Sequence, residues 1–507
     1  MSILICNGLV LTLDDQDHIY ESRDVLIEGD RIVQVGGQIA APRVEQVIDA
    51  SGHLVMPGLN VAHAHSFAQL FKGVFDGLPL DVWILDTNAP PLGWTSSPRQ
   101  NYLRTLLGAA ELIRSGATTI WDDLLLAPDL QDTFFHAYGE SGLRAYITAT
   151  MYDKRIPDRT LHLRQSLPPE MLGSLLGENM LTPDEWIATA EQIYQKWHGQ
   201  VGRLNFAVSV AWPQGSSDEM ISKGFALAEK YNLPFVTHVL ETKVQQATGP
   251  VLYGKSIVAH LDELGVLAPR TSIVHGIWVS DVDIEILGRN QVTVLHNPVS
   301  NLILGSGIMP MRRLMQAGVN IALGVDEGLQ TQWNPFEMMK TAALMQKIGG
   351  SAAPDWPTSH EILSMATRGG ARSELAEREI GALAPGMKAD VIVLDLNSLP
   401  FTPLNHLKNQ LVYLEPGTSV VTSIINGKLV MQDRRILTFD LDALLAEVGE
   451  MMPAYWKMHQ ERRTLEFPRK LRPYVEAIYR KVVEAPSGIN RWVGDEREWV
   501  KVKAVHE

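Results

Sequence analysis

Between residues 56 and 370, apolar β-like runs alternate with amphipathic helical runs, and this alternation restricts the folds open to the chain. Helical segments such as 100–115 and 218–230 separate most of the strands. Eight strand–helix units over about 300 residues favour a (β/α)8 TIM-like barrel over a doubly wound sheet. The eight expected strands are 54–65, 117–123, 144–150, 204–212, 234–241, 271–278, 291–297 and 320–326.

Both ends of this stretch are flanked by short β-like runs. Residues 1–55 hold several runs separated by turn signals, and β texture returns after Gly386, with Asn426-Gly427 suited to a tight hairpin turn. We therefore expect an α/β fold in which a small β-sandwich domain, built from both chain ends, accompanies the barrel. The expected division is 1–55 plus 375–440 for the β-sandwich, 56–374 for the barrel, and 441–507 for a helical C-terminal extension of unknown role.

Composition excludes several classes of function. The 44 basic and 58 acidic residues give a formal charge of -14, which argues against nucleic acid as the main partner. No uninterrupted apolar run reaches the roughly 18 residues of a membrane helix, so we expect no membrane partner. The single cysteine, Cys6, cannot form an internal disulfide, and the start of the chain lacks an export signal. We expect a cytoplasmic protein.

Ionisable side chains cluster at the ends of the expected strands, where barrel enzymes carry their catalytic groups. His63 and His65 stand two apart in a strand, so both imidazoles point to one face. His238 ends the fifth strand and Asp326 the eighth. Three imidazoles and one carboxylate are a credible ligand set for a divalent transition ion, with a position left for water.

Two further residues suit the chemistry of such an ion. A bound ion lowers the pKa of its water toward neutrality and supplies hydroxide as the nucleophile. Glu241 follows His238 by three residues and is placed to carry a proton from that water to a leaving nitrogen. His275, at the end of the sixth strand, could hold the hydroxide or stabilise developing charge. His296 precedes Asn297-Pro298, and we interpret it as part of a structural loop rather than as a ligand.

These motifs together resemble the amidohydrolase superfamily, in particular the branch of cytosine, guanine and adenosine-type deaminases and triazine hydrolases. They occur in the family order and span the whole barrel, and the resemblance extends through the flanking β segments. The motifs are Pro57-Gly58, His63-Ala64-His65, His238-Val239-Leu240-Glu241-Thr242, Val274-His275-Gly276, His296-Asn297-Pro298-Val299-Ser300-Asn301 and Leu323-Gly324-Val325-Asp326.

The resemblance assigns roles to the candidate residues. It implies that the ligand set above holds a single divalent metal ion, which we expect to be zinc, with iron as the alternative. It implies that Glu241 is the proton shuttle and His275 the second catalytic residue. The segment 204–212 contains no lysine, so the bridging carbamylated lysine of two-metal branches is not expected. The resemblance also implies a homo-oligomer.

The chain departs from the family pattern beside the predicted metal site. Where the family often reads Gly-Thr-Asp-Gly, this chain has Gly324-Val325-Asp326-Glu327-Gly328, which loses a hydroxyl and gains a charge. We name Gln69, Trp83 and Trp212 as candidate substrate-binding residues. Phe75 and Trp94 could join the two tryptophans in an apolar pocket wall, although aromatic residues of this kind equally well pack a core.

Several functions remain open from the sequence. The first is a mononuclear metal-dependent aminohydrolase that attacks a C–N bond of an N-heteroaromatic small molecule of purine, pyrimidine or s-triazine type with metal-bound hydroxide. The same site could hydrolyse an amide, urea or carbamate bond or dechlorinate a triazine, with a xenobiotic as substrate. A non-catalytic binding protein on this fold is a further alternative. The segment 249–256 matches a phosphate-loop pattern, but no strand directly precedes it, so we interpret it as a loop.

Overall fold

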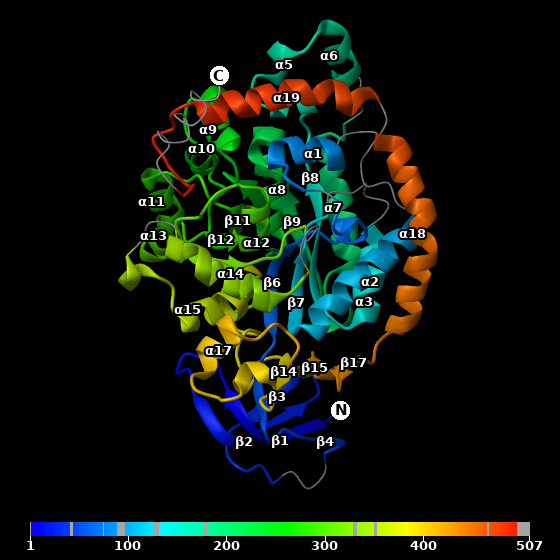
Figure 1. Cartoon of the computed structure of the whole chain (residues 1–507), viewed down its shortest axis with the longest axis vertical. Helices are drawn as coiled ribbons and strands as arrows, with labels where there is room; N and C mark the ends of the chain where they lie inside the picture. Colours follow the sequence, from blue (N-terminus) through cyan, green and yellow to red (C-terminus); the bar gives the residue numbers. More distant parts are fainter. Residues whose placement is uncertain are drawn as a thin grey trace.

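The computed structural model describes residues 2–40, 44–74, 76–88, 97–124, 131–176, 180–327, 332–348, 352–463 and 466–493. Two sheets organise the chain: an eight-stranded parallel sheet and a nine-stranded mixed sheet. Figure 1 shows the parallel sheet and its helices in the upper part of the molecule, with strands from both ends of the chain forming the lower part. The expected barrel and the accompanying sheet from both chain ends are confirmed.

The parallel sheet runs in chain order around the barrel. Its last strand returns to its first, because Val325 N donates to His63 O (2.9 Å) and His65 N donates to Asp326 O (3.2 Å). His63, His65 and Asp326 therefore stand where the barrel closes. The strands are β6 (Leu59–Ala64), β7 (Ala117–Asp122), β8 (Arg144–Met151), β9 (Leu204–Val210), β10 (Phe235–Val239), β11 (Thr271–His275), β12 (Thr293–His296) and β13 (Asn320–Leu323).

One expected strand is two strands in the structure. The segment predicted as a single strand from 54 to 65 divides into β5 (His53–Pro57), which belongs to the mixed sheet, and β6, which opens the barrel. Gly58 separates them, and a Cβ there would lie 2.1 Å from the side chain of Thr118. The apolar run is continuous because both strands are buried, so hydrophobicity alone could not reveal the break.

Each barrel strand contributes one residue to a compact inner cluster. Small residues such as Ala62 and Ala207 stand among the large Trp121 and Tyr146, so the volumes are complementary and the interior is filled. The cluster makes the barrel a packed core rather than a pore. Its strand members are Ala62, Trp121, Tyr146, Ala207, Val236, Val274, Leu295 and Ala322.

The mixed sheet joins the two ends of the chain. Strand β5 pairs in parallel with β1 and antiparallel with β14, so N-terminal and C-terminal strands are direct neighbours. A buried ion pair ties this sheet to the barrel: Arg144 Nε lies 2.7 Å from Asp390 Oδ2. Besides β5, its strands are β1 (Ser2–Leu11), β2 (Ile19–Glu28), β3 (Arg31–Val35), β4 (Gln46–Asp49), β14 (Val391–Asp395), β15 (Val420–Ile425), β16 (Lys428–Gln432) and β17 (Arg435–Ile436).

Local sequence signals start many of the helices. Ser97, Thr182 and Ser280 each form a capping box with the residue three positions later. The helices up to residue 230 are α1 (Leu80–Asn88), α2 (Pro98–Arg114), α3 (Gln131–Ser141), α4 (Ile156–Arg159), α5 (Leu163–Ser166), α6 (Pro169–Leu176), α7 (Pro183–Trp197) and α8 (Asp218–Lys230). They are followed by α9 (Lys243–Tyr253), α10 (Ile257–Glu263), α11 (Asp281–Arg289), α12 (Pro298–Ile303), α13 (Met311–Gln316), α14 (Pro335–Ile348), α15 (Ser359–Ser364), α16 (Gly370–Ser373) and α17 (Leu407–Tyr413).

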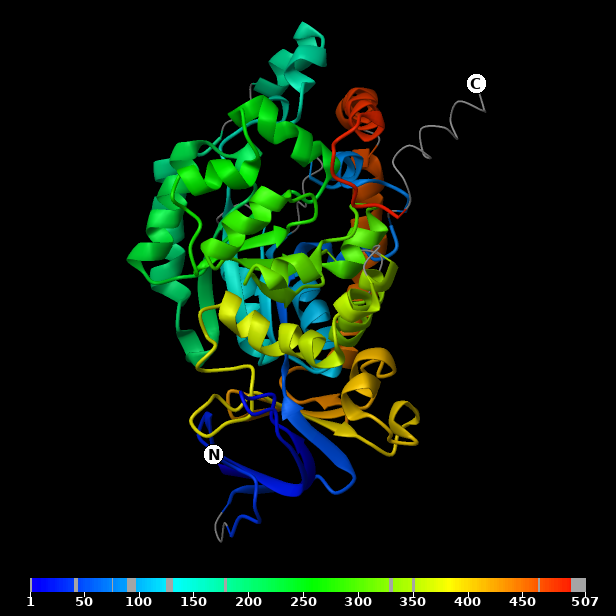
Figure 2. The same cartoon turned by 90° about the vertical axis from the view of Figure 1, so that its left-hand side faces the viewer.

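Two helices follow the mixed sheet in the described part of the C-terminal segment. Helix α18 (Leu441–Arg463) packs along α2, and α19 (Glu466–Glu484) packs on α1 and α9. Figures 1 and 2 both show α19 at the end of the molecule opposite the mixed sheet. None of the helices in the described residues is long and apolar enough to span a membrane.

Candidate metal and catalytic site

The histidine pair of β6 meets an aspartate at the seam where the barrel closes. His63 lies within β6 and His65 directly follows it, and their ring centroids are 4.6 Å apart. The Nε2 atoms of His63 and His65 lie 3.5 and 3.4 Å from Asp326 Oδ1. All three side chains are at most 3% exposed. The pairing between β6 and the end of β13 thus brings together residues far apart in the sequence.

Glycine is required beside Asp326. A Cβ on Gly324 would lie 2.2 Å from Asn297 Oδ1 and 2.8 Å from His63 Cβ. The chain can approach the histidine closely only without a side chain at this position. Asp326 itself adopts a positive φ of 60°, which turns the backbone sharply as it leaves the barrel. The Gly324-Val325-Asp326 sequence therefore reflects the geometry of the barrel seam.

His238, at the C-terminal half of β10, completes the imidazole cluster. Its Nδ1 donates to Ala211 O over 2.8 Å, which leaves Nε2 as the available ligand atom. One nitrogen from each of His63, His65 and His238 lies within 4.8 Å of the others. The three predicted histidines are therefore brought together by the fold.

The unpartnered polar atoms of this cluster fit a cation. Both ring nitrogens of His63 and both carboxylate oxygens of Asp326 are buried without a hydrogen-bond partner among the described residues. Buried polar groups without partners are costly, and a buried carboxylate costs most of all. Three imidazoles and one carboxylate suit a divalent ion such as zinc, so the donor set fits the group that the sequence implies.

A buried aspartate missed by sequence reasoning supports the histidines. Asp123 O lies 2.5 Å from His65 Nδ1, and Asp123 Oδ2 lies 3.9 Å from His238 Nδ1. Its carboxylate accepts hydrogen bonds from Thr148 and Thr150 on β8, and from Ser209 on β9. The signal that could have found Asp123 is its place at the end of the second strand, equivalent to the other site residues.

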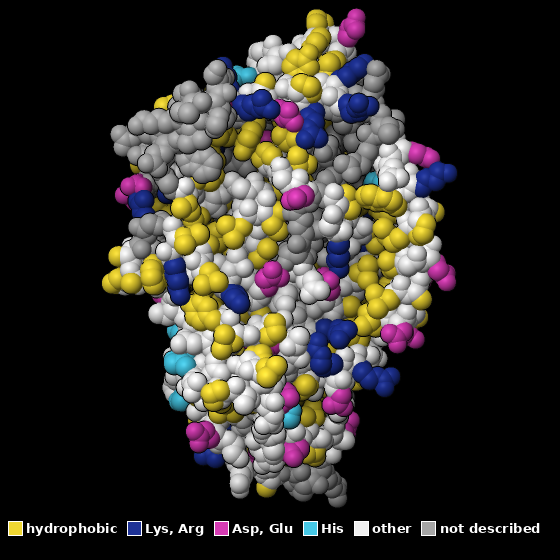
Figure 3. Space-filling model, viewed as in Figure 1, with side chains coloured by type: hydrophobic (Ala, Val, Ile, Leu, Met, Phe, Trp, Pro, Cys, Tyr) yellow, Lys and Arg dark blue, Asp and Glu magenta, His cyan; other side chains and the backbone are white. Residues whose placement is uncertain are grey.

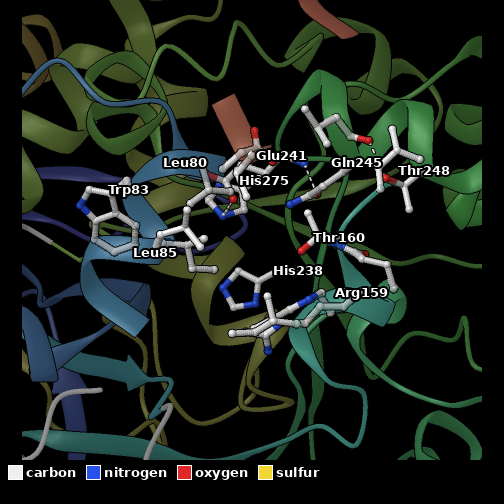
Figure 4. A pocket seen from close by; sticks show the side chains of 18 of the residues that line it. Leu80, Trp83, Leu85, Arg159, Thr160, His238, Glu241, Gln245, Thr248 and His275 are labelled. Carbon is white, nitrogen blue, oxygen red and sulfur yellow. Dashed lines mark hydrogen bonds and ion pairs between the residues drawn. The ribbon is translucent and has the colours of Figure 1, made fainter. Parts of the chain in front are cut away.

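Glu241 and His275 face one another beside the imidazole cluster. His275 Nε2 lies 3.4 Å from Glu241 Oε2 and 3.9 Å from Asp326 Oδ2. His275 Nδ1 lies 3.0 Å from Asn301 Oδ1, an acceptor, so we assign the ring proton to Nδ1 and a lone pair to Nε2. Figure 4 shows both side chains at the cavity together with His238.

Burial shifts the pKa values of this pair in opposite directions. It raises the pKa of Glu241 well above its usual range, and the negative charges of Asp326 and Asp81 raise it further. Burial lowers the pKa of His275 to about 4, although Asp326 opposes the shift. Both shifts favour the uncharged form of the side chain, so the imidazole is neutral.

His296 lies apart from the ligand cluster. It ends β12, is fully buried, and its ring nitrogens have no hydrogen-bond partner among the described residues. Burial, and then the charge of His275, lowers its pKa to about 3. Its neighbour Asn301 supports His275, so the segment after β12 contributes to the site through that amide.

A cavity opens over Glu241, His275 and His238 at the C-terminal ends of the strands. Trp83 and Trp212 line it, whereas Gln69 is buried and is not among the residues that line it in the described part of the chain. Phe75 and Trp94 lie outside the described residues. The lining residues that were not predicted include Asp81, Arg159, Gln214, Gln245, Glu327 and Val475.

Two of these unpredicted residues add carboxylates to the cavity. Asp81 lies in the first turn of α1, and burial raises its pKa to about 7. Glu327 follows Asp326 directly, and one of its carboxylate oxygens lies within 4.8 Å of ligand atoms of His65 and Asp326. On the other side, the Arg159 guanidinium stands 5.0 Å over the Trp212 ring. The cavity thus combines aromatic surface with hydrogen-bond acceptors.

The phosphate-loop pattern at 249–256 is not a loop. Gly249 lies within α9, whereas Ser256 caps α10 and donates to Asp283. Lys255 pairs with Glu263 on the surface, with an Nζ–Oε2 distance of 2.5 Å. The interpretation as a loop was wrong because the pattern spans the junction of two short helices, and helical geometry offers no cradle of backbone amides.

Comparison with known proteins identifies the family of the chain. A sequence model described as the amidohydrolase family matches residues 54–430. The chain belongs to the amidohydrolase family. A 5′-deoxyadenosine deaminase from Methanosarcina mazei is 33% identical over 447 residues, covering 88% of this chain and 96% of the relative. A 5-methylthioadenosine/S-adenosylhomocysteine deaminase from Caldanaerobacter subterraneus subsp. tengcongensis is 32% identical over 450 residues, covering 88% and 97%.

A solved structure agrees with this assignment. An adenosine deaminase from Xanthomonas campestris, solved with bound zinc, matches with a TM-score of 0.78 at 27% identity, covering 91% of this amidohydrolase and 98% of that chain. The expected family and fold are confirmed. The expectation of a metal-dependent hydrolase that acts on carbon–nitrogen bonds other than peptide bonds is confirmed as well.

Proposed function

We propose that this amidohydrolase is a mononuclear aminohydrolase that replaces the exocyclic amine of an adenosine-type purine with oxygen. The observation that carries the proposal is the meeting of Glu241 and His275 with the buried His63, His65, His238 and Asp326 cluster at one cavity. Relatives more than 30% identical over most of their length are deaminases of adenosine derivatives, which supports this substrate class over the pyrimidine and triazine alternatives.

In this proposal, His63, His65, His238 and Asp326 hold one zinc ion. A divalent ion at this position lowers the pKa of a coordinated water toward neutrality. The chain orients its ligands through hydrogen bonds of the opposite ring nitrogens: His65 Nδ1 to Asp123 O and His238 Nδ1 to Ala211 O. Such outer contacts fix the tautomer and the ring orientation of a ligating histidine.

Glu241 carries the proton in the proposed reaction. Beside a bound cation the carboxyl group is ionised, so Glu241 takes a proton from the water that attacks the ring carbon and later delivers it to the amine nitrogen. The carbon–nitrogen bond breaks, the nitrogen leaves as ammonia, and the ring carbon keeps the oxygen of the water. Neutral His275, fixed by Asn301 through Nδ1, presents Nε2 toward Glu241 and orients the reacting groups.

The cavity walls position the ring. Trp83 and Trp212 supply flat apolar surface suited to an aromatic heterocycle, and the Arg159 guanidinium covers the Trp212 ring. Asp81 and Glu327 offer acceptors for donor groups of the substrate. The cavity thus combines apolar walls, which suit the ring, with polar groups that can fix its orientation.

Ammonia release from a panel of small molecules tests the proposal. The panel comprises 5′-deoxyadenosine, methylthioadenosine, guanine, cytosine, an aminated triazine and an aryl urea. We expect turnover of the adenosine derivatives at a kcat/KM at least about tenfold above that of any other compound. Preferred hydrolysis of the urea or of the triazine would contradict the proposed substrate class, and absence of turnover by metal-loaded protein would contradict deamination.

Other properties belong to the same proposal. We propose a cytoplasmic location, supported by the lone cysteine Cys6, and a homo-oligomeric state, which sedimentation velocity tests. We also propose that 1–55 with 375–440, 56–374 and 441–507 are the structural units of the chain. This division is supported by the two separate sheets and by the helical path of α18 and α19.

A further inference from the structure

The C-terminal segment lies outside the stretch that matches the amidohydrolase family and yet reaches the cavity. The family match ends at residue 430, whereas α18 and α19 occupy residues 441–484. We refer to the described residues 441–463 and 466–493 as the C-terminal strap. In Figure 1, α18 rises along the edge of the barrel from β17, and α19 crosses the end of the molecule above α1. Figure 2 shows α19 viewed along its axis, at the end of the molecule opposite the mixed sheet.

Helix α18 anchors the strap next to the metal-ligand loop. Tyr455 is 2% exposed and packs on Phe71, with ring centroids 5.7 Å apart. Phe71 ends the 3-10 helix η1 (Ser66–Phe71), which starts directly after His65. On the surface, Arg99 Nε of α2 lies 2.7 Å from Glu447 Oε1. The first half of the strap is therefore fixed to the elements that follow β6.

Helix α19 lays one apolar face over the loops of three barrel strands. Leu471, Val475 and Ile478 follow helical spacing and are at most 9% exposed. They belong to one apolar cluster with residues of α1, α4 and α9, which follow β6, β8 and β10: Leu85, Ile156 and Val244. The outer face is polar, and Figure 3 shows basic side chains near the top of the view, where α19 lies.

The end of the strap is tied to two further loops. Arg491 donates from Nε to Ile277 O (2.8 Å) and from Nη2 to Val279 O (2.6 Å), directly after β11. Trp492 Nε1 donates to Gly305 O over 3.0 Å, in the segment after β12. Lys243 Nζ, two residues past Glu241, donates to Val483 O over 3.1 Å. The strap thus spans the mouth of the barrel and is held on both sides.

Val475 is the residue of the strap that lines the cavity, together with His238, Glu241 and His275. We propose that the C-terminal strap forms the outer wall of the active cavity and that Val475 selects substrates by the size of the group remote from the reacting ring. This inference rests on the proposed aminohydrolase function for the identity of the ring. The cavity is apolar near Val475, with Leu85, Ile156 and Val244 in the same cluster, so the remote group it accepts is small and apolar.

The physical basis is the size discrimination of the apolar part of the cavity wall around Val475. One methylene group that fits or clashes in such a pocket changes kcat/KM by about tenfold or more. Val475 is held by buried neighbours on both sides, Leu471 and Ile478, so the wall cannot easily move aside. A larger side chain at position 475 therefore shortens the cavity, and a smaller one lengthens it.

Substrate specificity tests the inference directly. We would compare wild type, Val475→Ala, Val475→Phe and the control Ala477→Val, which adds volume on the exposed face of the same helix. The substrates are 5′-deoxyadenosine and its 5′-butylthio analogue. We expect Val475→Ala to raise the ratio of kcat/KM for the long over the short substrate by about tenfold, and Val475→Phe to lower it similarly. The control should leave the ratio unchanged.

A binding measurement decides the same question without turnover. Hydroxamates chelate catalytic metal ions whatever the natural substrate, so calorimetry with acetohydroxamate and with butyl- and octyl-tailed hydroxamates probes the length of the cavity in the metal-loaded protein. We expect Val475→Phe to weaken binding of the tailed compounds relative to acetohydroxamate by about tenfold, and Val475→Ala to strengthen it.

The two measurements distinguish failure of the proposed function from failure of the inference about Val475. If wild type deaminates no compound but the hydroxamate series responds to position 475, the proposed function fails and the wall at Val475 stands. If turnover occurs and both Val475 variants keep the wild-type ratio and the wild-type hydroxamate affinities, the inference is overturned and the function stands. Circular dichroism and metal content show whether each variant is folded. If Val475→Phe does not fold, Val475→Ala alone still tests the inference.

Discussion

Nε2 of His275 lies 3.4 Å from Oε2 of Glu241, and both side chains are buried at the base of the cavity. The imidazole is oriented by Asn301 from behind, and the backbone N–H of Glu241 donates to Gln245 Oε1 over 2.8 Å. Burial raises the pKa of the carboxyl group and lowers that of the imidazole. The pair therefore places a carboxyl group beside a neutral imidazole, an arrangement suited to proton transfer.

Replacement of Glu241 by Gln separates metal binding from proton transfer. We expect Glu241→Gln to retain the wild-type metal content, because Glu241 is not among the proposed ligands, and to lower kcat by about 10²–10⁴-fold. Stopped assays of ammonia release and elemental analysis of the same sample measure both quantities. Glu263→Gln, on the surface pair with Lys255, is the control and should keep full activity. Near-normal turnover by Glu241→Gln would exclude the carboxylate as the proton carrier.

Removal of a proposed ligand should remove the ion. We expect about one zinc or iron ion per chain in the wild type, and less than about a tenth of that in His63→Ala and Asp326→Ala, because a three-ligand remnant binds weakly. Inductively coupled plasma analysis after dialysis measures the content. His360→Ala, which alters an exposed histidine, is the control. Two tightly bound ions per chain in the wild type would contradict the mononuclear site.

The predicted site residues converge because strand ends of a parallel barrel share one face, which sequence periodicity can reveal. A correct count of the strands was enough to predict that His63, His238 and Asp326 lie together. Val475 could not be predicted in this way, because it reaches the cavity from a helix whose path over the barrel depends on packing. The break at Gly58 was missed for a related reason: two successive buried strands read as one apolar run.

Asp123 should act as a positioning residue for the histidines. We expect Asp123→Asn to lower metal affinity by about 10–100-fold, because its carboxylate lies next to His238 and collects donors from β8 and β9. Competition with a fluorescent zinc chelator measures the affinity. Measuring kcat and KM separately at saturating zinc then distinguishes misplaced histidines from a damaged fold. Ser209→Ala, which removes one donor at 3.2 Å, should have a smaller effect. Equal affinities in Asp123→Asn and wild type would contradict this role.

Another buried carboxyl group, Glu374 at the opposite end of the barrel, should make stability depend on pH. Asn60 Nδ2 donates to Glu374 Oε2 over 2.8 Å, while Oε1 has no hydrogen-bond partner among the described residues. Burial raises the pKa of Glu374 to about 8, although the hydrogen bond from Asn60 and the charge of Arg144 oppose the shift. The native protein thus holds a proton on Glu374 at neutral pH that the unfolded chain, with an ordinary glutamate, releases.

The sign of the effect follows from linkage. Between the ordinary glutamate pKa and about 8, the native state binds the extra proton, so its stability falls as pH rises through this window. Glu374→Gln carries a permanently neutral group, so its free energy of unfolding should lose this part of the dependence on pH. We expect its calorimetric midpoint to match wild type near pH 5 and to exceed it by roughly 1–4 °C near pH 8.5. Glu377→Gln, at an exposed position three residues on, should follow wild type at both pH values. A constant difference between Glu374→Gln and wild type across the window would show that Glu374 is not protonated in the native state at neutral pH.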